Sequence, residues 1–195
     1  MSAAEKIVHA ATMADLEALP ESVKGELIDG VLYAMTRPRM QHQVTAGHIH
    51  GEYYNPYQRG RGGPGGWWIL PEPGIQLLPR APEISPDVAG WRVERLPEMQ
   101  REKSITVVPD WVCEVLSPST PRHNLVVKKP FYASVGVPWL WMVDSEAMAV
   151  TVHELRGGQW VEVGVFSDEP EARIPPFTEV AVDLRAWWPA NASAG

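Results

Sequence analysis

The segment Trp111-Val112-Cys113-Glu114-Val115-Leu116 contains one charged residue in six and is otherwise apolar. A near-continuous apolar run that a turn follows predicts a strand at the centre of a sheet, covered on both faces. In such a strand the carboxylate of Glu114 would lose its hydration, at a cost of several kcal/mol unless a partner compensates it. Glu114 therefore belongs either to a compensated buried site or to an edge strand, where it would reach water or pair with an arginine.

Two further carboxylates lie in short strand-like runs. Asp87 ends one of them and follows Pro86, whose ring fixes the local backbone. An aspartate after a proline is also ordinary turn and capping chemistry. Glu26 follows Gly25 at the start of a hairpin strand, where an exposed glutamate is the simpler interpretation. Both acids are candidates for a site, and for each the structural interpretation stays open.

A lysine faces the apolar side of a helix predicted over residues 122–135. At about 100° per residue, Lys128 is centred on an apolar stripe and Lys129 falls to its side. The stripe consists of Leu125, Phe131, Tyr132 and Val135. A lysine on such a stripe can extend its stem along the core and keep its ammonium at the rim. Only five of the 17 basic side chains are lysines, which weakly favours a site that needs a compact ammonium.

Two carboxylates and an ammonium form a set that supports metal-assisted hydrolysis of phosphodiesters. Carboxylate oxygens on neighbouring strands are hard ligands of the kind that Mg²⁺ prefers. The ion polarises a phosphoryl oxygen and activates its attacking water, while a lysine stabilises the developing charge or positions that water. A further glutamate could bind a second ion or orient the first. The residues thus point to a hydrolase acting on phosphodiesters.

The remaining pattern predicts a mixed α/β protein, classed as α/β (α+β mixed). Thr12 and Asp15 form a capping box before a short helix that stops at Pro20, and Asp29-Gly30 joins two strand-like runs as a hairpin turn. We expect a second helix over residues 40–59 and a loop over residues 60–66. Gly136 is expected to end the helix predicted over residues 122–135. Strands are expected at residues 24–28, 31–35, 67–78, 83–91, 110–116, 139–143, 149–155, 159–166 and 179–184. The order of elements favours a central mixed sheet flanked by helices, with additional β-hairpins.

Length and charge narrow the class of protein. The 195 residues, 21.7 kDa, suit a single domain over residues 1–195, with a core at about 12–188 and short flexible termini. The chain has neither a secretory signal nor an apolar run of about 18 residues, and Cys113 is its one cysteine, so we expect a cytoplasmic protein without a membrane partner. The net charge of −7 argues against tight nonspecific binding to DNA.

Several motifs, in their order and spacing, resemble one family of proteins. They are Gly25-Glu26-Leu27-Ile28-Asp29-Gly30, His42, Ser85-Pro86-Asp87-Val88, Cys113-Glu114-Val115-Leu116-Ser117-Pro118-Ser119-Thr120, Lys128 with Tyr132, and Gly136-Val137-Pro138 leading into Trp141-Met142-Val143-Asp144. In these motifs the chain resembles the Uma family, second group, a bacterial set of restriction-endonuclease-like proteins in the PD-(D/E)XK nuclease superfamily. The resemblance spans roughly residues 12 to 188.

The resemblance implies a restriction-endonuclease-like core and a divalent-metal-dependent endonuclease that hydrolyses DNA. Asp87 would match the first acid of the superfamily motif and Glu114 the second, with Glu26 as an upstream acid; these three would hold Mg²⁺ or Mn²⁺. The usual lysine position is occupied by Leu116, and a lysine of the following helix, Lys128, would replace it. Asp87, Glu114, Lys128 and Glu26 are the predicted catalytic residues.

Two departures from the family pattern affect the predicted helix. Asn124 stands where relatives commonly have an aspartate, which removes a charge near the turn after Glu114. Pro130 lies where the helix normally continues, and it cannot donate a hydrogen bond to the carbonyl of Val126. We therefore expect a kink or a restart at Pro130. A restart there would place Lys128 before the helix rather than on its apolar stripe.

Although the chain as a whole is acidic, one segment of it has an excess of arginine. Residues 37–61 contain four arginines against Glu52, a local charge of four minus one, or +3. These arginines are Arg37, Arg39, Arg59 and Arg61, and they could form a basic rim beside an acidic pocket. The candidate substrate-binding residues are His42, Arg37, Arg39 and Ser117. We expect weak DNA binding with steep salt dependence, or help from a homodimer partner.

Two other functions remain open. A non-catalytic binding or assembly protein could retain the nuclease fold with a vestigial metal site, and it would not bind Mn²⁺ through Glu114. A metal-dependent hydrolase of smaller phosphodiesters would cleave a model diester in place of DNA. Each is distinguished from a DNA endonuclease by a simple assay.

Overall fold

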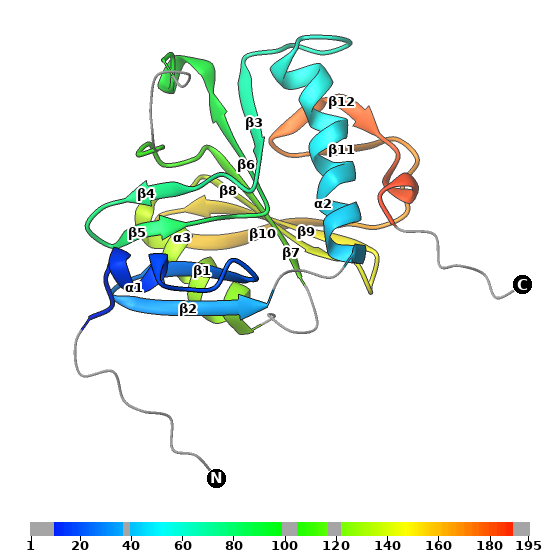
Figure 1. Ribbon diagram of the computed structural model, residues 1–195. Helices are drawn as coiled ribbons and strands as arrows, with labels where there is room; N and C mark the ends of the chain where they lie inside the picture. The colour runs from blue at the N-terminus through cyan, green and yellow to red at the C-terminus, as the bar shows by residue number, and fades with distance from the viewer. Residues whose placement is uncertain (1–9, 37–39, 99–104, 117–121, 189–195) are drawn as a thin grey trace, which may run out of the picture. The chain divides into compact units, whose positions relative to one another are not determined.

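The computed structural model describes residues 10–36, 40–98, 105–116 and 122–188 (Figure 1). Its contacts group the chain into two compact units that alternate along the sequence. The smaller unit comprises Met1–Arg37, Gly74–Ser85 and Lys103–Val107, and the larger comprises Pro38–Pro73, Pro86–Glu102 and Val108–Gly195. The single-domain organisation stays a prediction, and each unit is described by itself below.

The smaller unit contains a four-stranded sheet in the order β2-β1-β5-β4. Its strands are β1 (Val23–Ile28), β2 (Val31–Thr36), β4 (Ile75–Leu77) and β5 (Ala81–Ile84). Asp29 and Gly30 join β1 to β2 with positive φ angles of 48° and 76°, which a tight hairpin turn requires. The predicted capping box is confirmed: Thr12 and Asp15 cap α1 (Met13–Glu17) reciprocally.

The larger unit contains a six-stranded mixed sheet in the order β10-β9-β8-β7-β6-β3. Its strands are β3 (Trp67–Pro71), β6 (Val88–Arg92), β7 (Trp111–Leu116), β8 (Trp139–Asp144), β9 (Ala149–Arg156) and β10 (Gln159–Phe166). β7 runs parallel to β8, and every other neighbouring pair is antiparallel. β7 thus lies between two strands, as its apolar sequence predicts.

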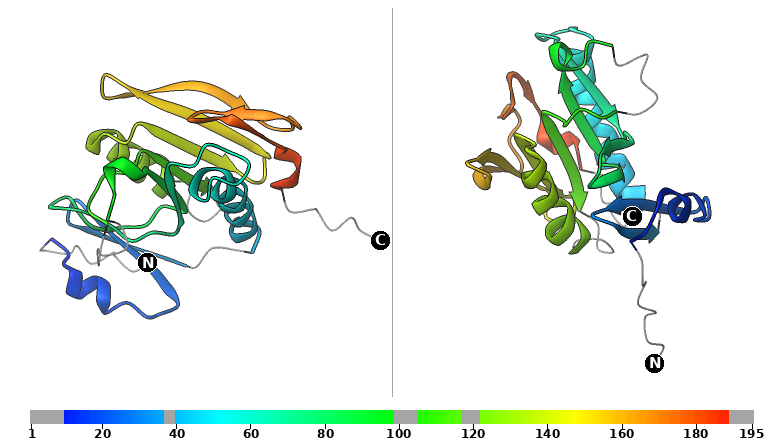
Figure 2. Two further views of the ribbon diagram at one scale, coloured as in Figure 1. Left: turned by 90° about the horizontal axis from the view of Figure 1, so that it is seen from above. Right: turned by 90° about the vertical axis from the view of Figure 1, so that its left-hand side faces the viewer.

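Helical segments cover both faces of this sheet (Figure 2). On one face lie α2 (Met40–Tyr53) and the π-helix η1 (Tyr54–Gln58); on the other lie the π-helix η4 (His123–Lys128) and α3 (Lys129–Val135). Gly136 ends α3 in the left-handed conformation, as predicted. Short 3₁₀ segments follow β6 and β12, at Val93–Arg95 and Leu184–Ala186. Among the described residues, no helix has the length and hydropathy that a membrane crossing needs.

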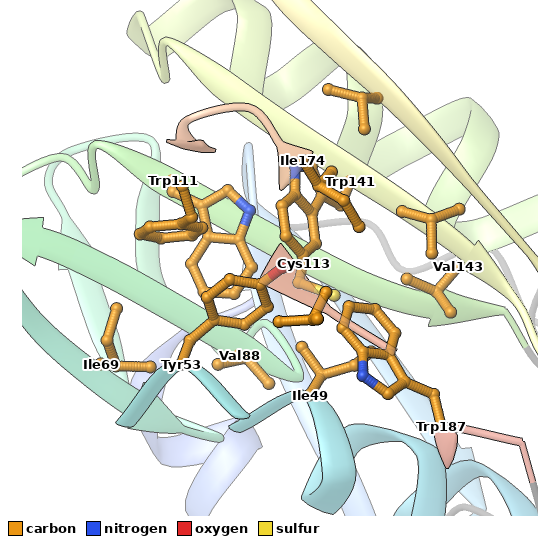
Figure 3. Packing of buried hydrophobic residues seen from close by; sticks show 14 of the residues in the cluster. Ile49, Tyr53, Ile69, Val88, Trp111, Cys113, Trp141, Val143, Ile174 and Trp187 are labelled. Atoms are coloured by element: carbon orange, nitrogen blue, oxygen red, sulfur yellow. The ribbon is translucent and has the colours of Figure 1, made fainter. Parts of the chain in front are cut away.

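The core of the larger unit lies between α2 and the sheet (Figure 3). Tyr53 packs against the rings of Trp111 and Trp141, with centroid distances of 6.2 and 5.3 Å. A hairpin of β11 (Ala172–Ile174) and β12 (Phe177–Val182) adds Phe177 to the same cluster. The sequence pattern did not predict β11, because three residues carry too little periodicity to identify a strand. The odd-numbered side chains of β7, Trp111, Cys113 and Val115, belong to this core and therefore face α2.

Candidate active site

Glu114 lies in the central strand β7 and is only 2% exposed, so the edge-strand interpretation is wrong. The Nζ atom of Lys128 lies 2.6 Å from Oε1 of Glu114, and the hydroxyl of Tyr132 donates to the same oxygen over 2.6 Å. Lys128 belongs to η4 and Tyr132 to α3, the two segments that cover the face of the sheet opposite α2. The ion pair and the hydrogen bond supply the compensation that a buried carboxylate needs.

Asp87 precedes β6, and its carboxylate is bound from two directions. Oδ2 accepts a hydrogen bond from the backbone amide of Val115 over 2.8 Å and lies 3.0 Å from Nε2 of His42 in α2. The residue is 5% exposed. Turn chemistry is therefore not its main role, because its side chain joins the start of β6 to the neighbouring strand β7 and to α2.

Both acids lie beside the pairing of β6 with β7. These strands are antiparallel with Val88 opposite Cys113; Asp87 directly precedes Val88, and Glu114 directly follows Cys113. The backbone amide that binds Asp87 belongs to Val115, the residue after Glu114. Burial raises the pKa of the Cys113 thiol well above its usual value, and the charges of Asp87 and Glu114 raise it further. Both carboxylates thus act on one thiol, which stays protonated and inert.

The helical segment that carries Lys128 does not restart at Pro130; it changes from π to α geometry one residue earlier, at Lys129, and Lys128 faces Glu114. Residues His123–Lys128 form the π-helix η4, α3 begins at Lys129, and Pro130 occupies its first turn. The prediction that Leu125 belongs to the buried stripe is wrong, since Leu125 is 46% exposed. The wider turn of a π-helix rotates Leu125 to solvent and buries Asn124 together with Lys128.

Glu26 lies in β1 of the smaller unit and is fully buried, so its interpretation as an exposed strand residue is wrong. Its Oε1 accepts a hydrogen bond from the amide of Ser85 over 3.0 Å. Burial raises the pKa of Glu83, and the charge of Glu26 adds to this rise. Two acids therefore lie near each other within this unit, and a role for Glu26 in metal binding stays a prediction.

The substrate-binding candidates have different outcomes. Arg37, Arg39 and Ser117 lie outside the described residues. His42 is buried and bound to Asp87, which is a positioning contact, and substrate binding by it stays a prediction.

The expected basic rim is wrong for Arg59 and Arg61, which are exposed beyond the opposite end of α2 from His42. His42 and Arg59 are 59 minus 42, or 17, residues apart along α2 and η1, which corresponds to about 20–25 Å. These two arginines therefore lie far from the acids.

The donor set fits a divalent ion with oxygen ligands. Mg²⁺ is usually held by one or two carboxylates and retains several waters, and each carboxylate has about four acceptor positions. Asp87, directly before β6, and Glu114, in β7, offer two such groups. The described part of the chain contains no cluster of three His, Cys, Asp or Glu side chains that could bind a metal. An ion at this site would therefore depend on water or substrate for its remaining ligands.

Tyr132 is a further site residue, beside the catalytic residues predicted from the sequence. It donates to the same oxygen of Glu114 that Lys128 approaches. The signal was its spacing, because residues four positions apart share one side of a helix. A tyrosine four residues after the candidate lysine could thus have been assigned to the acid.

Comparisons with known proteins agree with this architecture. A crystal structure of a putative nuclease belonging to DUF820 from Anabaena variabilis ATCC 29413 superposes with a TM-score of 0.70 at 20% sequence identity, covering 91% of this chain and 97% of that one. Because the identity is low, this likeness shows the fold. A search of curated proteins found no match. The model of the family Uma2, described as "Putative restriction endonuclease", matches residues 12–186, and the chain therefore belongs to this family.

Proposed function

We propose that the protein is a divalent-metal-dependent endonuclease that hydrolyses phosphodiester bonds of DNA at a PD-(D/E)XK-like site. The observation that carries the proposal is the placement of two buried acids beside the β6–β7 pairing: Asp87 binds the amide of Val115, the residue after Glu114, and Glu114 is bound to Lys128. Membership in a family described as restriction endonucleases supports the same reaction class. Mg²⁺ or Mn²⁺ as cofactor, a homodimer and a cytoplasmic location belong to the proposal as predictions.

Asp87 and Glu114 would hold the metal ion. When bound, the ion would supply Lewis-acid activation of a phosphoryl oxygen and of a water molecule. Both carboxylates are at least nine-tenths buried. Electrostatic interactions at such a place are stronger than in water, so the two acids can attract a cation that a surface pair would bind weakly.

The other site residues hold these acids in place and supply positive charge. The ammonium of Lys128 lies beside Glu114. In this position it can stabilise negative charge that develops on a phosphate. Tyr132 fixes the same carboxylate by a hydrogen bond, and His42 fixes Asp87 from α2. Each carboxylate is thus oriented by donors from an element other than its own strand, which keeps it in one geometry.

The direct test is nicking of supercoiled plasmid DNA by the purified protein. We expect conversion to the open circular form in Mg²⁺ or Mn²⁺ and no conversion after chelation. A model diester and an RNA of the same length as the plasmid are tested separately as alternative substrates. Metal-saturated protein that cleaves no nucleic acid would contradict the proposal; cleavage of the model diester alone would favour a hydrolase of small phosphodiesters. The absence of Mn²⁺ binding would favour a non-catalytic binding protein.

A further inference from the structure

Two consecutive lysines at the junction of η4 and α3 reach different strands of the sheet. Lys128 binds Glu114 in β7, whereas Nζ of Lys129 lies 2.7 Å from Nε2 of His153 in β9. The register places β8 between these two strands, and it puts Glu114 and His153 on the same face. The junction therefore extends across three strands, with one lysine at each side.

Pro130 interrupts the backbone hydrogen bonding of this junction. The last backbone hydrogen bond of η4 runs from the amide of Lys129 to the carbonyl of Asn124. The next residue, Pro130, has no amide hydrogen to donate. A π-helical turn is rare and depends on its surroundings. The direction of Lys128 is thus not determined by helix geometry alone.

A second contact, from the edge strand β10, also holds Lys129. The indole nitrogen of Trp160 in β10 donates to the backbone carbonyl of Lys129 over 2.8 Å. The ring of Trp160 also meets that of His153 nearly edge-on, with centroids 6.3 Å apart. Lys129 is therefore bound through its side chain by β9 and through its backbone by β10.

We propose that His153 and Trp160, by holding Lys129, position the η4–α3 junction so that Lys128 and Tyr132 reach Glu114. We name this set of three residues, Lys129, His153 and Trp160, the Lys129 anchor. As an influence on catalysis the inference rests on the proposed function, whereas its effect on the Lys128–Glu114 pair does not. The anchor residues are positioning residues, because they bind the junction rather than either carboxylate.

The protonation state of His153 matters to the anchor. An ammonium at Lys129 needs a neutral imidazole whose Nε2 accepts the hydrogen bond. Burial lowers the pKa of His153, and the charge of Lys129 lowers it further, while Glu162 in β10 opposes both. Burial also lowers the pKa of Lys129, again opposed by Glu162. Protonation of His153 would place two cations side by side and open the contact.

Replacement of Trp160 by Phe tests the anchor, since it removes the indole donor and retains an aromatic ring. The readout is the ¹⁵N-labelled ammonium signal of Lys128, assigned by its loss in Lys128→Met; the chain has only five lysines. We expect its hydrogen exchange to accelerate about fivefold, the effect of one neutral hydrogen bond. The turnover number for plasmid nicking should fall by a similar factor without a change in the half-saturating metal concentration.

Trp68→Phe is the matched control, because Trp68 also donates to a backbone carbonyl, that of Leu96 in the same unit, over 3.0 Å. Equal effects of the two substitutions, or no effect of Trp160→Phe, would overturn the inference. Should Trp160→Phe fail to fold, Lys129→Met provides the same readout. A wild-type protein that cuts no DNA would defeat the proposed function, and the exchange measurement would still decide the anchor.

The pH dependence of stability gives a second prediction. Because the pKa of His153 in the folded chain lies below the usual histidine pKa of about 6.5, the unfolded chain binds more protons than the folded chain as the pH falls through this range. The free energy of unfolding should therefore fall from about pH 7 to about pH 5. His153→Gln keeps an acceptor for Lys129 without titrating, so its stability should fall less. Urea unfolding at several pH values measures this dependence. If the free energy of unfolding falls equally with pH in the wild-type protein and in His153→Gln, the assignment to His153 is contradicted. His50, whose pKa burial also lowers, remains in both proteins.

Discussion

Glu114→Gln lowers the free energy of unfolding by about 3–5 kcal/mol, the cost of removing one partner from a buried ion pair. The substitution retains the shape of the side chain, and its amide oxygen can still accept the hydrogen bond from Tyr132. What it removes is the negative charge 2.6 Å from the ammonium of Lys128, which is 3% exposed. Urea denaturation of the two proteins measures the difference.

A double-mutant cycle separates this charge effect from simple repacking. Glu114→Gln combined with Lys128→Met should recover most of the loss, because no uncompensated ammonium remains in the core. Glu154→Gln is the surface control, since Glu154 pairs with the exposed Arg156 and should cost less than about 1 kcal/mol. Additive effects of the two core substitutions would show that Glu114 and Lys128 do not interact energetically.

Asp87→Asn reduces metal-dependent plasmid nicking by about a thousandfold or more, a loss typical of removing groups that stabilise transition-state charge. The asparagine oxygen can still accept from the amide of Val115, so the strand end is retained. The negative charge and one hard ligand are lost. Initial nicking rates at saturating Mn²⁺ measure the effect.

Asp183→Asn is the matched control for this substitution. Asp183 belongs to the same unit and pairs with Arg185 at the surface, and its removal should leave the nicking rate unchanged. An Asp87→Asn protein that is folded and cuts DNA at the wild-type rate would exclude Asp87 from the catalytic machinery. Equal losses in the two variants would point to an effect of stability rather than chemistry.

Local signals in the sequence predicted much of the fold. The Asp29-Gly30 hairpin, the Thr12 capping box and the Gly136 helix end depend on contacts within a few residues, and all are confirmed. The central position of β7 followed from its apolar composition, since a strand buried on both faces needs no polar alternation. Interactions of this kind leave a pattern that one sequence carries by itself.

Contacts between distant residues could not be predicted in the same way. His42 and Asp87 are 45 positions apart, and nothing in either local segment specifies that they meet. The two π-helices also escaped prediction, because a pattern based on 100° per residue cannot represent a wider turn. For this reason the α-helical pattern places Leu125 on the wrong side of its helix, whereas it places Lys128 on the correct side.

Calorimetric titration of Mn²⁺ into the wild-type protein and Asp87→Asn tests the central claim most directly. If Asp87 and Glu114 form the metal site, the wild-type protein binds Mn²⁺ and the variant binds it about 10–100-fold more weakly or not at all. The Asp183→Asn control should titrate like the wild-type protein. A wild-type protein that binds no Mn²⁺, or an Asp87→Asn protein with unchanged affinity, would contradict the account.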